Sequence, residues 1–327
     1  MNKIKNTFAA KILSNIPPRV KPIDYLMETL NISRESVYRR IRGNISFTFD
    51  EIAKLSFELG FSIDELIMKD TPSHIFFDLH ISTEQDPSEV FVTKFQQYFQ
   101  YIFNMSNVQD TESTMITNQV PFEFIILFNN LFKFTYYRWM HQYQEISIKY
   151  FYSDVVLPDK LKYLQHQAVE NFKKVKSNTF IFDSNIFLNM IREVHYYYKR
   201  RLINDNEFAQ LRKDLTGLID LVESIAQTGY YNSNAKFIFY LSSLNIESSS
   251  RFTEFNEHVQ SQFFIEAIEP INISNLNLCA LHKKWLDSRR KYSTLISLSN
   301  EILQVKYFNK QRAYTEEIAD NAFPLFC

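Results

Sequence analysis

The sequence predicts a mainly α-helical protein of the α+β class, built from a small helical domain and a larger, aromatic-rich domain. Three observations predict this class. Helix-start signals crowd the first seventy residues, and apolar residues recur at helical spacing through most of the rest. Only a few short stretches alternate with period two, which predicts a small antiparallel sheet. The length of 327 residues agrees with two domains.

The helix starts predicted in residues 1–70 share one capping pattern. Ser33, Thr48 and Ser62 each follow an apolar residue and precede another four positions later, the pattern of an N-cap with a hydrophobic staple. Thr48 and Ser62 also have a glutamate three residues on, which completes a capping box. With amphipathic segments at 7–16 and 23–30, these signals predict five short helices.

The second and third of these helices are joined by a tight turn at Asn31, and the helix that follows is rich in arginine. That layout is typical of a helix-turn-helix. The runs LNISRESVYRRIRG (30–43), TFDEIAKL (48–55) and LGFSIDEL (59–66) together resemble the lambda-repressor/Cro-like (XRE) helix-turn-helix family. The resemblance implies a sequence-specific, DNA-binding transcriptional regulator that places its recognition helix, residues 33–42, in the major groove of double-stranded DNA.

Charge is distributed in agreement with that function. The net charge of the chain is −1, but residues 1–44 carry nine bases and three acids, a balance of +6. Helical geometry places Val37 and Ile41 on the core face of the third helix. The candidate base-reading residues lie on its outer face or at its start: Arg34, Glu35, Ser36 and Arg39. The candidate phosphate contacts are Arg19, Lys21, Arg40, Arg42 and Asn44. The alternative is a solvated basic face on a protein-interaction module.

The larger domain is expected at 74–327, after a linker at 71–73. Helical spacing of apolar residues marks three segments of it: 91–105, 161–175 and 208–225. Residues 122–143 are apolar on nearly all sides and are expected to form a buried central helix. Period-two alternation marks three candidate strands of the small sheet: 75–81, 236–242 and 262–268.

Composition excludes several function classes. The four glycines are too far apart for a phosphate-binding or dinucleotide-binding loop, and the two cysteines lack metal or redox spacing. His74, Asp78 and His80 fall on one face of a candidate strand, but a wet polar face explains them better than a metal site. With no signal peptide and no membrane span in the sequence, we expect a soluble, cytoplasmic protein without cofactor, metal or catalytic activity.

Three roles for residues 74–327 follow from these observations. We favour an effector-sensing and dimerising domain, whose effector is a small molecule or a protein. The second role is a protein-interaction module of the antitoxin or partner-docking type, with incidental DNA binding. The third is an appended enzyme such as a nuclease. Five apolar residues near the C-terminus have the helical spacing of either an internal core or a homodimer interface: Trp285, Leu295, Leu298, Ile302 and Val305.

Overall fold

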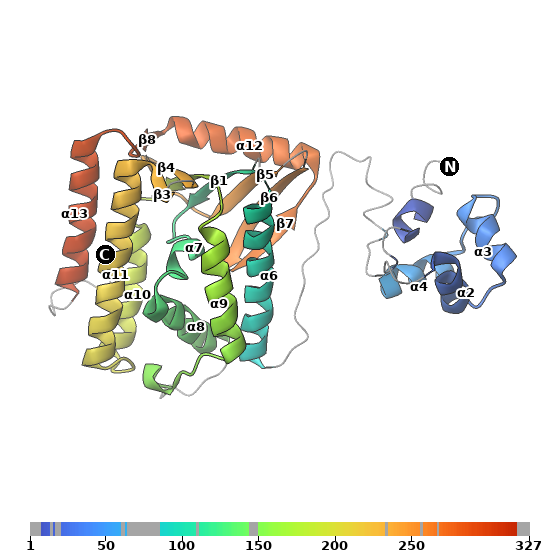
Figure 1. The fold of residues 1–327 in the computed structure, drawn as a ribbon, viewed down its shortest axis with the longest axis horizontal. Helices are drawn as coiled ribbons and strands as arrows, with labels where there is room; N and C mark the ends of the chain where they lie inside the picture. Colours follow the sequence, from blue (N-terminus) through green and yellow to red (C-terminus); the bar gives the residue numbers. More distant parts are fainter. Residues whose placement is uncertain are drawn as a thin grey trace. The chain divides into compact units, whose positions relative to one another are not determined.

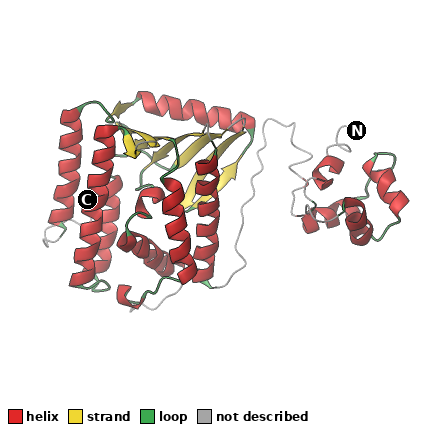
Figure 2. Cartoon of the chain, in the orientation of Figure 1, coloured by secondary structure: helices red, strands yellow, loops and turns green. Residues whose placement is uncertain are grey.

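The computed structural model describes residues 8–13, 16, 21–59, 63, 86–108, 111–143, 150–232, 235–255, 258–266 and 268–318. The chain divides into two compact units, Met1–Phe76 and Phe77–Cys327 (Figures 1 and 2). The expected linker at 71–73 lies outside the described residues. So do the candidate strand at 75–81 and the residues His74, Asp78 and His80.

The first unit is helical throughout its described elements. Residues 8–13 are helical and are followed by α2 (Pro22–Leu30), α3 (Arg34–Ile41) and α4 (Phe49–Leu59). Each labelled helix contributes one fully buried side chain to a common core, namely Leu26, Val37 and Leu55. The core face predicted for the third helix is therefore confirmed at Val37. The helix expected to start at Ser62 lies outside the described residues except for Ile63.

Local capping chemistry explains where α3 and α4 begin. The backbone N–H of Ser36 donates to Ser33 Oγ at 3.3 Å, so Ser33 is the N-cap of α3. Thr48 and Glu51 exchange side-chain-to-backbone hydrogen bonds of 2.8 and 3.3 Å, which is the predicted capping box. Asn31 adopts the left-handed conformation, with φ of 53°, in the turn between α2 and α3. The tight turn predicted there is confirmed.

The second unit joins a helical layer to one large sheet. Its helices are α6 (Pro87–Asn107), α7 (Phe122–Ile125), α8 (Asn129–Tyr143), the 3-10 turn η1 (Tyr152–Asp154), α9 (Asp159–Phe172), α10 (Ile186–Lys199), α11 (Asp205–Thr228), α12 (Leu276–Lys291) and α13 (Glu301–Glu317). Its strands are β1 (Thr111–Thr117), β2 (Ser177–Phe182), β3 (Tyr230–Asn232), β4 (Ala235–Ser242), β5 (Ser250–Phe255), β6 (His258–Glu266), β7 (Glu269–Ile273) and β8 (Ser293–Leu295).

The expectation of a small antiparallel sheet is wrong. Eight strands form a mixed sheet in the order β3-β4-β2-β1-β5-β6-β7, with β8 also paired to β4. β1, β2 and β4 run parallel to one another, and the remaining pairings are antiparallel. The candidate strand at 236–242 lies within β4, and residues 262–266 of the candidate at 262–268 belong to β6. They are not partners, because β2, β1 and β5 lie between them.

Helices cover both faces of this sheet, but unequally. α12 packs on one face, where Ile116, Phe252 and Cys279 belong to a small apolar cluster. The main core lies on the other face, under α6 to α11 and α13, and includes Met115 and Phe180 (Figure 1). Consecutive residues Met115 and Ile116 therefore face opposite layers, as the pleat of a strand requires.

The expected central helix at 122–143 is interrupted. α7 ends at Ile125 and α8 begins at Asn129, with a turn between them. The backbone N–H of Asn130 donates to the Asp214 carboxylate of α11 at 3.0 Å, which satisfies one of the donors that the new helix start leaves free. Both helices and the turn between them are mostly buried, so all three are rich in apolar residues. The sequence therefore does not show where the first helix ends and the second begins.

Candidate functional sites

The outer face of α3 is the first candidate site. With Val37 turned into the core, Arg34, Glu35 and Arg39 are exposed. Arg34 Nη2 lies 4.0 Å from the carboxylate of Asp24 on α2, and both side chains are more than half exposed, so this contact holds Arg34 only weakly. Three of the four predicted base-reading side chains are therefore presented together at the start and on the outer side of one helix.

Ser36, the fourth predicted base-reading residue, lies differently. It is only half-exposed, and its hydroxyl accepts a hydrogen bond of 3.0 Å from Ser33 Oγ. The Ser36 side chain is thereby tied to the N-cap of its own helix. Its hydroxyl retains donor capacity for a further contact.

Arg40 does not share the free surface of its neighbours. Its Nε and Nη2 atoms donate to the two carboxylate oxygens of Glu51 at 3.0 and 2.8 Å, and each side chain is about 85% buried, with 13% and 15% exposed. Burial raises the pKa of Glu51, but hydrogen bonds from Arg40 and Thr48 outweigh it, so this pKa is lowered overall. Arg40 joins α3 to the start of α4, and this geometry favours a positioning role over a phosphate contact.

The other predicted phosphate contacts flank the helix. Lys21, Arg42 and Asn44 are exposed, and the Arg42 guanidinium lies 5.7 Å from the centre of the Tyr38 ring. Arg42 and Asn44 follow α3 directly, whereas Lys21 precedes α2. Arg19 lies outside the described residues. Lys21, Arg42 and Asn44 thus lie close to α3 in the sequence and are exposed to solvent.

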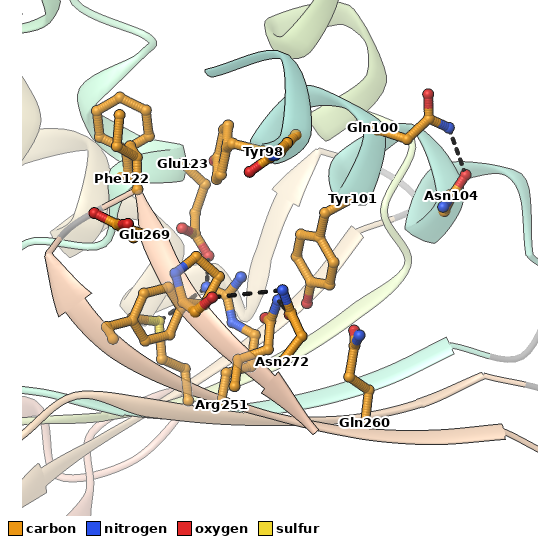
Figure 3. Close-up of a pocket in the computed structure, with 16 residues that line it drawn as sticks. Tyr98, Gln100, Tyr101, Asn104, Phe122, Glu123, Arg251, Gln260, Glu269 and Asn272 are labelled. Atoms are coloured by element: carbon orange, nitrogen blue, oxygen red, sulfur yellow. Dashed lines mark hydrogen bonds and ion pairs between the residues drawn. The ribbon is translucent and has the colours of Figure 1, made fainter. Parts of the chain in front are cut away.

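The second candidate site is a cavity of about 390 Å³ in the second unit. α6 forms its roof, the antiparallel strands β5, β6 and β7 form its floor, and α7 closes one end (Figure 3). Figure 3 shows Tyr101 extending from α6 toward the strands and Gln260 rising from the sheet toward α6. No pattern in the sequence predicted this cavity.

Strand register builds the floor of the cavity. Met115 of β1 lies opposite Arg251 of β5, Arg251 opposite Gln262 of β6, and Gln262 opposite Asn272 of β7. Directly opposed residues point to the same side of a sheet, so all four face α6. Gln262 Nε2 donates to Asn272 Oδ1 at 2.9 Å, and Arg251 Nη2 lies 2.9 Å from Met115 Sδ. The result is a row of four side chains, three of them polar, held in a fixed order.

A buried ion pair anchors this row. Arg251 is 2% exposed, Glu123 of α7 is 3% exposed, and the guanidinium donates to the carboxylate. Burial lowers the pKa of Arg251, but the charge of Glu123 and the neighbouring tyrosines more than offset it, so the pKa is raised and the cation persists. The Arg251 guanidinium also lies 5.5 Å from the centre of the Tyr101 ring.

Four of the five C-terminal apolar residues singled out in the sequence are substantially exposed. Trp285 of α12 is 44% exposed, Leu298 is 61% exposed, and Ile302 and Val305 of α13 are 85% and 45% exposed. Leu295 of β8 is only partly exposed. The described part of the second unit therefore does not use Ile302 and Leu298 as internal core.

The described residues hold neither a membrane-spanning helix nor a cluster of metal-ligating side chains. No helix among them is both long and apolar enough to cross a membrane. Within the same residues, no group of three or more His, Cys, Asp and Glu side chains has the arrangement of a metal site.

Comparisons with known proteins give no further guidance on either site. Neither the family models, nor the curated proteins, nor the solved structures include a match to this chain.

Proposed function

We propose that the protein is a sequence-specific, DNA-binding transcriptional regulator whose first unit is a five-helix, lambda-repressor-like (XRE) helix-turn-helix domain. The observation that carries the proposal is the arrangement of α2 and α3. A left-handed Asn31 joins the two helices, and α3 buries Val37 while it presents Arg34, Glu35 and Arg39 to solvent. A recognition helix needs that geometry, because the core holds it while its outer side chains reach the base edges.

The side chains divide into two roles in this proposal. Arg34, Glu35, Ser36 and Arg39 read base edges, because guanine offers acceptors to arginine and cytosine offers a donor to glutamate. Arg19, Lys21, Arg42 and Asn44 contact phosphates and set the register on the duplex. Arg40 holds α3 on α4 through Glu51, so it acts on DNA through the placement of the helix.

The second unit serves dimerisation and effector sensing. A single recognition helix reads few base pairs, and two helices about one turn of DNA apart read a pseudo-palindrome. The exposed apolar residues Leu298, Ile302 and Val305 are the best candidates for the isologous contact. In this proposal the protein catalyses no reaction, and it binds DNA in the cytoplasm.

Selection of DNA fragments from a random pool by the full-length chain tests this proposal. We expect enrichment of one discrete pseudo-palindromic site, with strong loss of enrichment for Arg39→Ala. A matched control is Lys283→Ala, which removes a partly exposed cation from α12 of the second unit and should enrich the same site. Recovery of no common sequence by the unmodified chain contradicts sequence-specific regulation.

A second candidate function is protein docking by the first unit, with incidental DNA binding. Phe49 and Phe57 of α4 favour it, because they are 74% and 87% exposed and lie about two helical turns apart. Phe57→Ser separates the two functions. If Phe57→Ser enriches the same DNA site as the unmodified protein, the regulator function is supported. If the first unit serves docking alone, neither the unmodified protein nor Phe57→Ser enriches a discrete DNA site.

A further inference from the structure

Three residues that line the cavity under α6 each carry a buried polar side-chain atom without a partner among the described residues. Tyr98 Oη, Arg251 Nε and Gln262 Oε1 have no hydrogen-bond partner within the part of the chain that the structure describes. Their residues are 8%, 2% and 3% exposed and come from α6, β5 and β6. Buried polar groups are normally paired, so an unpaired one costs stability unless a partner binds there. Three on separate elements around one cavity point to a ligand.

The types of these atoms restrict the chemistry of that ligand. Arg251 Nε–H is a donor, Gln262 Oε1 is an acceptor, and the Tyr98 hydroxyl is both. Burial, together with the charge of Glu123, raises the pKa of Tyr98, so its proton stays on the hydroxyl and remains available to an acceptor. A ligand hydroxyl group donates and accepts at once, and several on one scaffold match all three atoms.

The rim of the cavity repeats the same chemistry. Neutral amide side chains surround it on both the helix and the strands: Gln97, Gln100, Asn104, Gln260 and Asn272. An amide offers both a donor and an acceptor, so a row of them suits neighbouring hydroxyl groups. Gln100 and Asn104 already form such a pair with each other, at 2.9 Å (Figure 3).

Charge around the cavity favours an uncharged ligand. The Arg251 cation is matched by Glu123, and Lys94 of α6 is matched by Glu269 of β7. A ligand anion or cation would bring a further buried charge, for which these two matched pairs hold no spare counter-charge. A neutral ligand leaves both ion pairs in place.

Aromatic side chains form the remaining walls of the cavity, and its volume limits the size of the ligand. The rings of Tyr101, Phe122 and Phe264 line the cavity and give apolar surfaces on which C–H groups pack. Its volume of about 390 Å³ lies near the lower end of small-molecule sites and excludes a long peptide. The three unpaired atoms are screened from water in this conformation, so a ligand reaches them by displacing neighbouring side chains.

We propose that this cavity binds a small, uncharged, polyhydroxylated molecule of the size of a monosaccharide or disaccharide. Tyr98 Oη, Arg251 Nε and Gln262 Oε1 bind its hydroxyl groups, and the aromatic side chains pack on its apolar face. The site is defined without reference to DNA, so it stands or fails independently of the regulatory function proposed above.

Saturation-transfer NMR with the full-length chain tests the proposal, because it detects weak binding. The probes are glucose, galactose, mannose, xylose, maltose and cellobiose, with glucuronate and glucosamine as charged counterparts of matched size. We expect saturation transfer to at least one neutral sugar and none to the charged pair. Transfer to none of the neutral sugars, or to a charged one in preference, overturns the proposal.

Two variants locate the binding. Tyr98→Phe and Gln262→Leu each remove one unpaired atom and should weaken the bound sugar about tenfold. Tyr307→Phe is the matched control, because Tyr307 of α13 is also buried, its hydroxyl has no partner among the described residues, and it does not line the cavity. Should Gln262→Leu fail to fold, Tyr98→Phe decides, since it loses only a hydroxyl without a partner. Equal sugar binding by Tyr98→Phe and Tyr307→Phe contradicts the assignment.

Discussion

Arg40 and Glu51 are joined by two hydrogen bonds of 2.8 and 3.0 Å that connect α3 to the start of α4. Arg39, its neighbour in the chain, is exposed on the outer face of the same helix. Adjacent arginines of one helix therefore have different environments, one turned toward another helix and one toward solvent. Substitution of Arg40 should therefore affect folding, and substitution of Arg39 should affect the proposed binding of DNA.

Arg40→Ala should lower the free energy of unfolding of the first unit by about 1–3 kcal/mol, because it leaves the Glu51 carboxylate largely buried without its charged donor. Arg39→Ala should change that free energy by less than about 0.5 kcal/mol, as exposed substitutions usually do. Urea unfolding of the full-length variants measures both. Equal stability of the two variants would mean that the Arg40–Glu51 pair contributes nothing to the fold.

Arg39→Ala and Arg42→Ala should also differ in their effect on DNA. Loss of a base contact costs about 1–3 kcal/mol on the selected site and little on random DNA, whereas loss of a phosphate contact weakens both about equally. Fluorescence anisotropy on selected and scrambled duplexes at several salt concentrations measures the difference. The slope of log affinity against log salt should become shallower by about 1 for Arg42→Ala. Identical profiles for the two variants contradict the division into base and phosphate contacts.

His282 should make the second unit less stable in mild acid. Its ring nitrogens lie 2.9 Å from Ser261 Oγ and 3.0 Å from Ser250 Oγ, and burial lowers its pKa to about 4. The unfolded chain, in which this pKa is about 6.5, binds more protons below pH 6.5, so stability falls as pH drops from 6.5 toward 4. Above pH 6.5 the histidine is neutral in both states and adds no pH dependence.

Between pH 7 and pH 5 this single group should lower the free energy of unfolding by about 2 kcal/mol. His282→Gln removes the titrating ring, so the comparison of the two chains isolates its share from that of other acid-sensitive groups. Urea titrations at both pH values give the difference. A variant that loses as much stability as the parent between these pH values shows that the pKa of His282 is the same in the folded and the unfolded chain.

Ile302→Glu should weaken the proposed homodimer without harming the fold, because Ile302 is 85% exposed on α13. We expect sedimentation equilibrium at micromolar concentration to show a dimer for the parent chain and a shift toward monomer for the variant. Val156→Glu is the control, since Val156 is 77% exposed but follows η1, in another part of the same unit. A strictly monomeric parent chain rules out the proposed interface.

The elements of the first unit were predictable because their signals are local. The Ser33 cap, the Thr48–Glu51 capping box and the left-handed Asn31 each depend on neighbours within a few residues. The role of Arg40 was not predictable, because Glu51 lies eleven residues away and one helix later. Spacing on a single helix cannot show which arginine a neighbouring helix engages.

The sheet was underestimated for a different reason. β1 reads TESTMIT and β2 reads SNTFIF, and both contain hydroxyl or amide side chains at buried positions, such as Ser113, Thr117 and Asn178. Strands buried between two layers need not alternate between apolar and polar residues. Period-two alternation therefore does not predict β1 and β2. The cavity was missed because its central pair, Glu123 and Arg251, lies 128 residues apart in sequence.

The position of α6 in the chain has a mechanical consequence. This helix supplies Tyr98 and Tyr101 to the cavity roof, and it is also the first described helix of the second unit, beginning at Pro87. The same helix therefore joins the cavity to the start of the described part of the second unit, so a movement of α6 against the strands, by a ligand or by a mutation, displaces both.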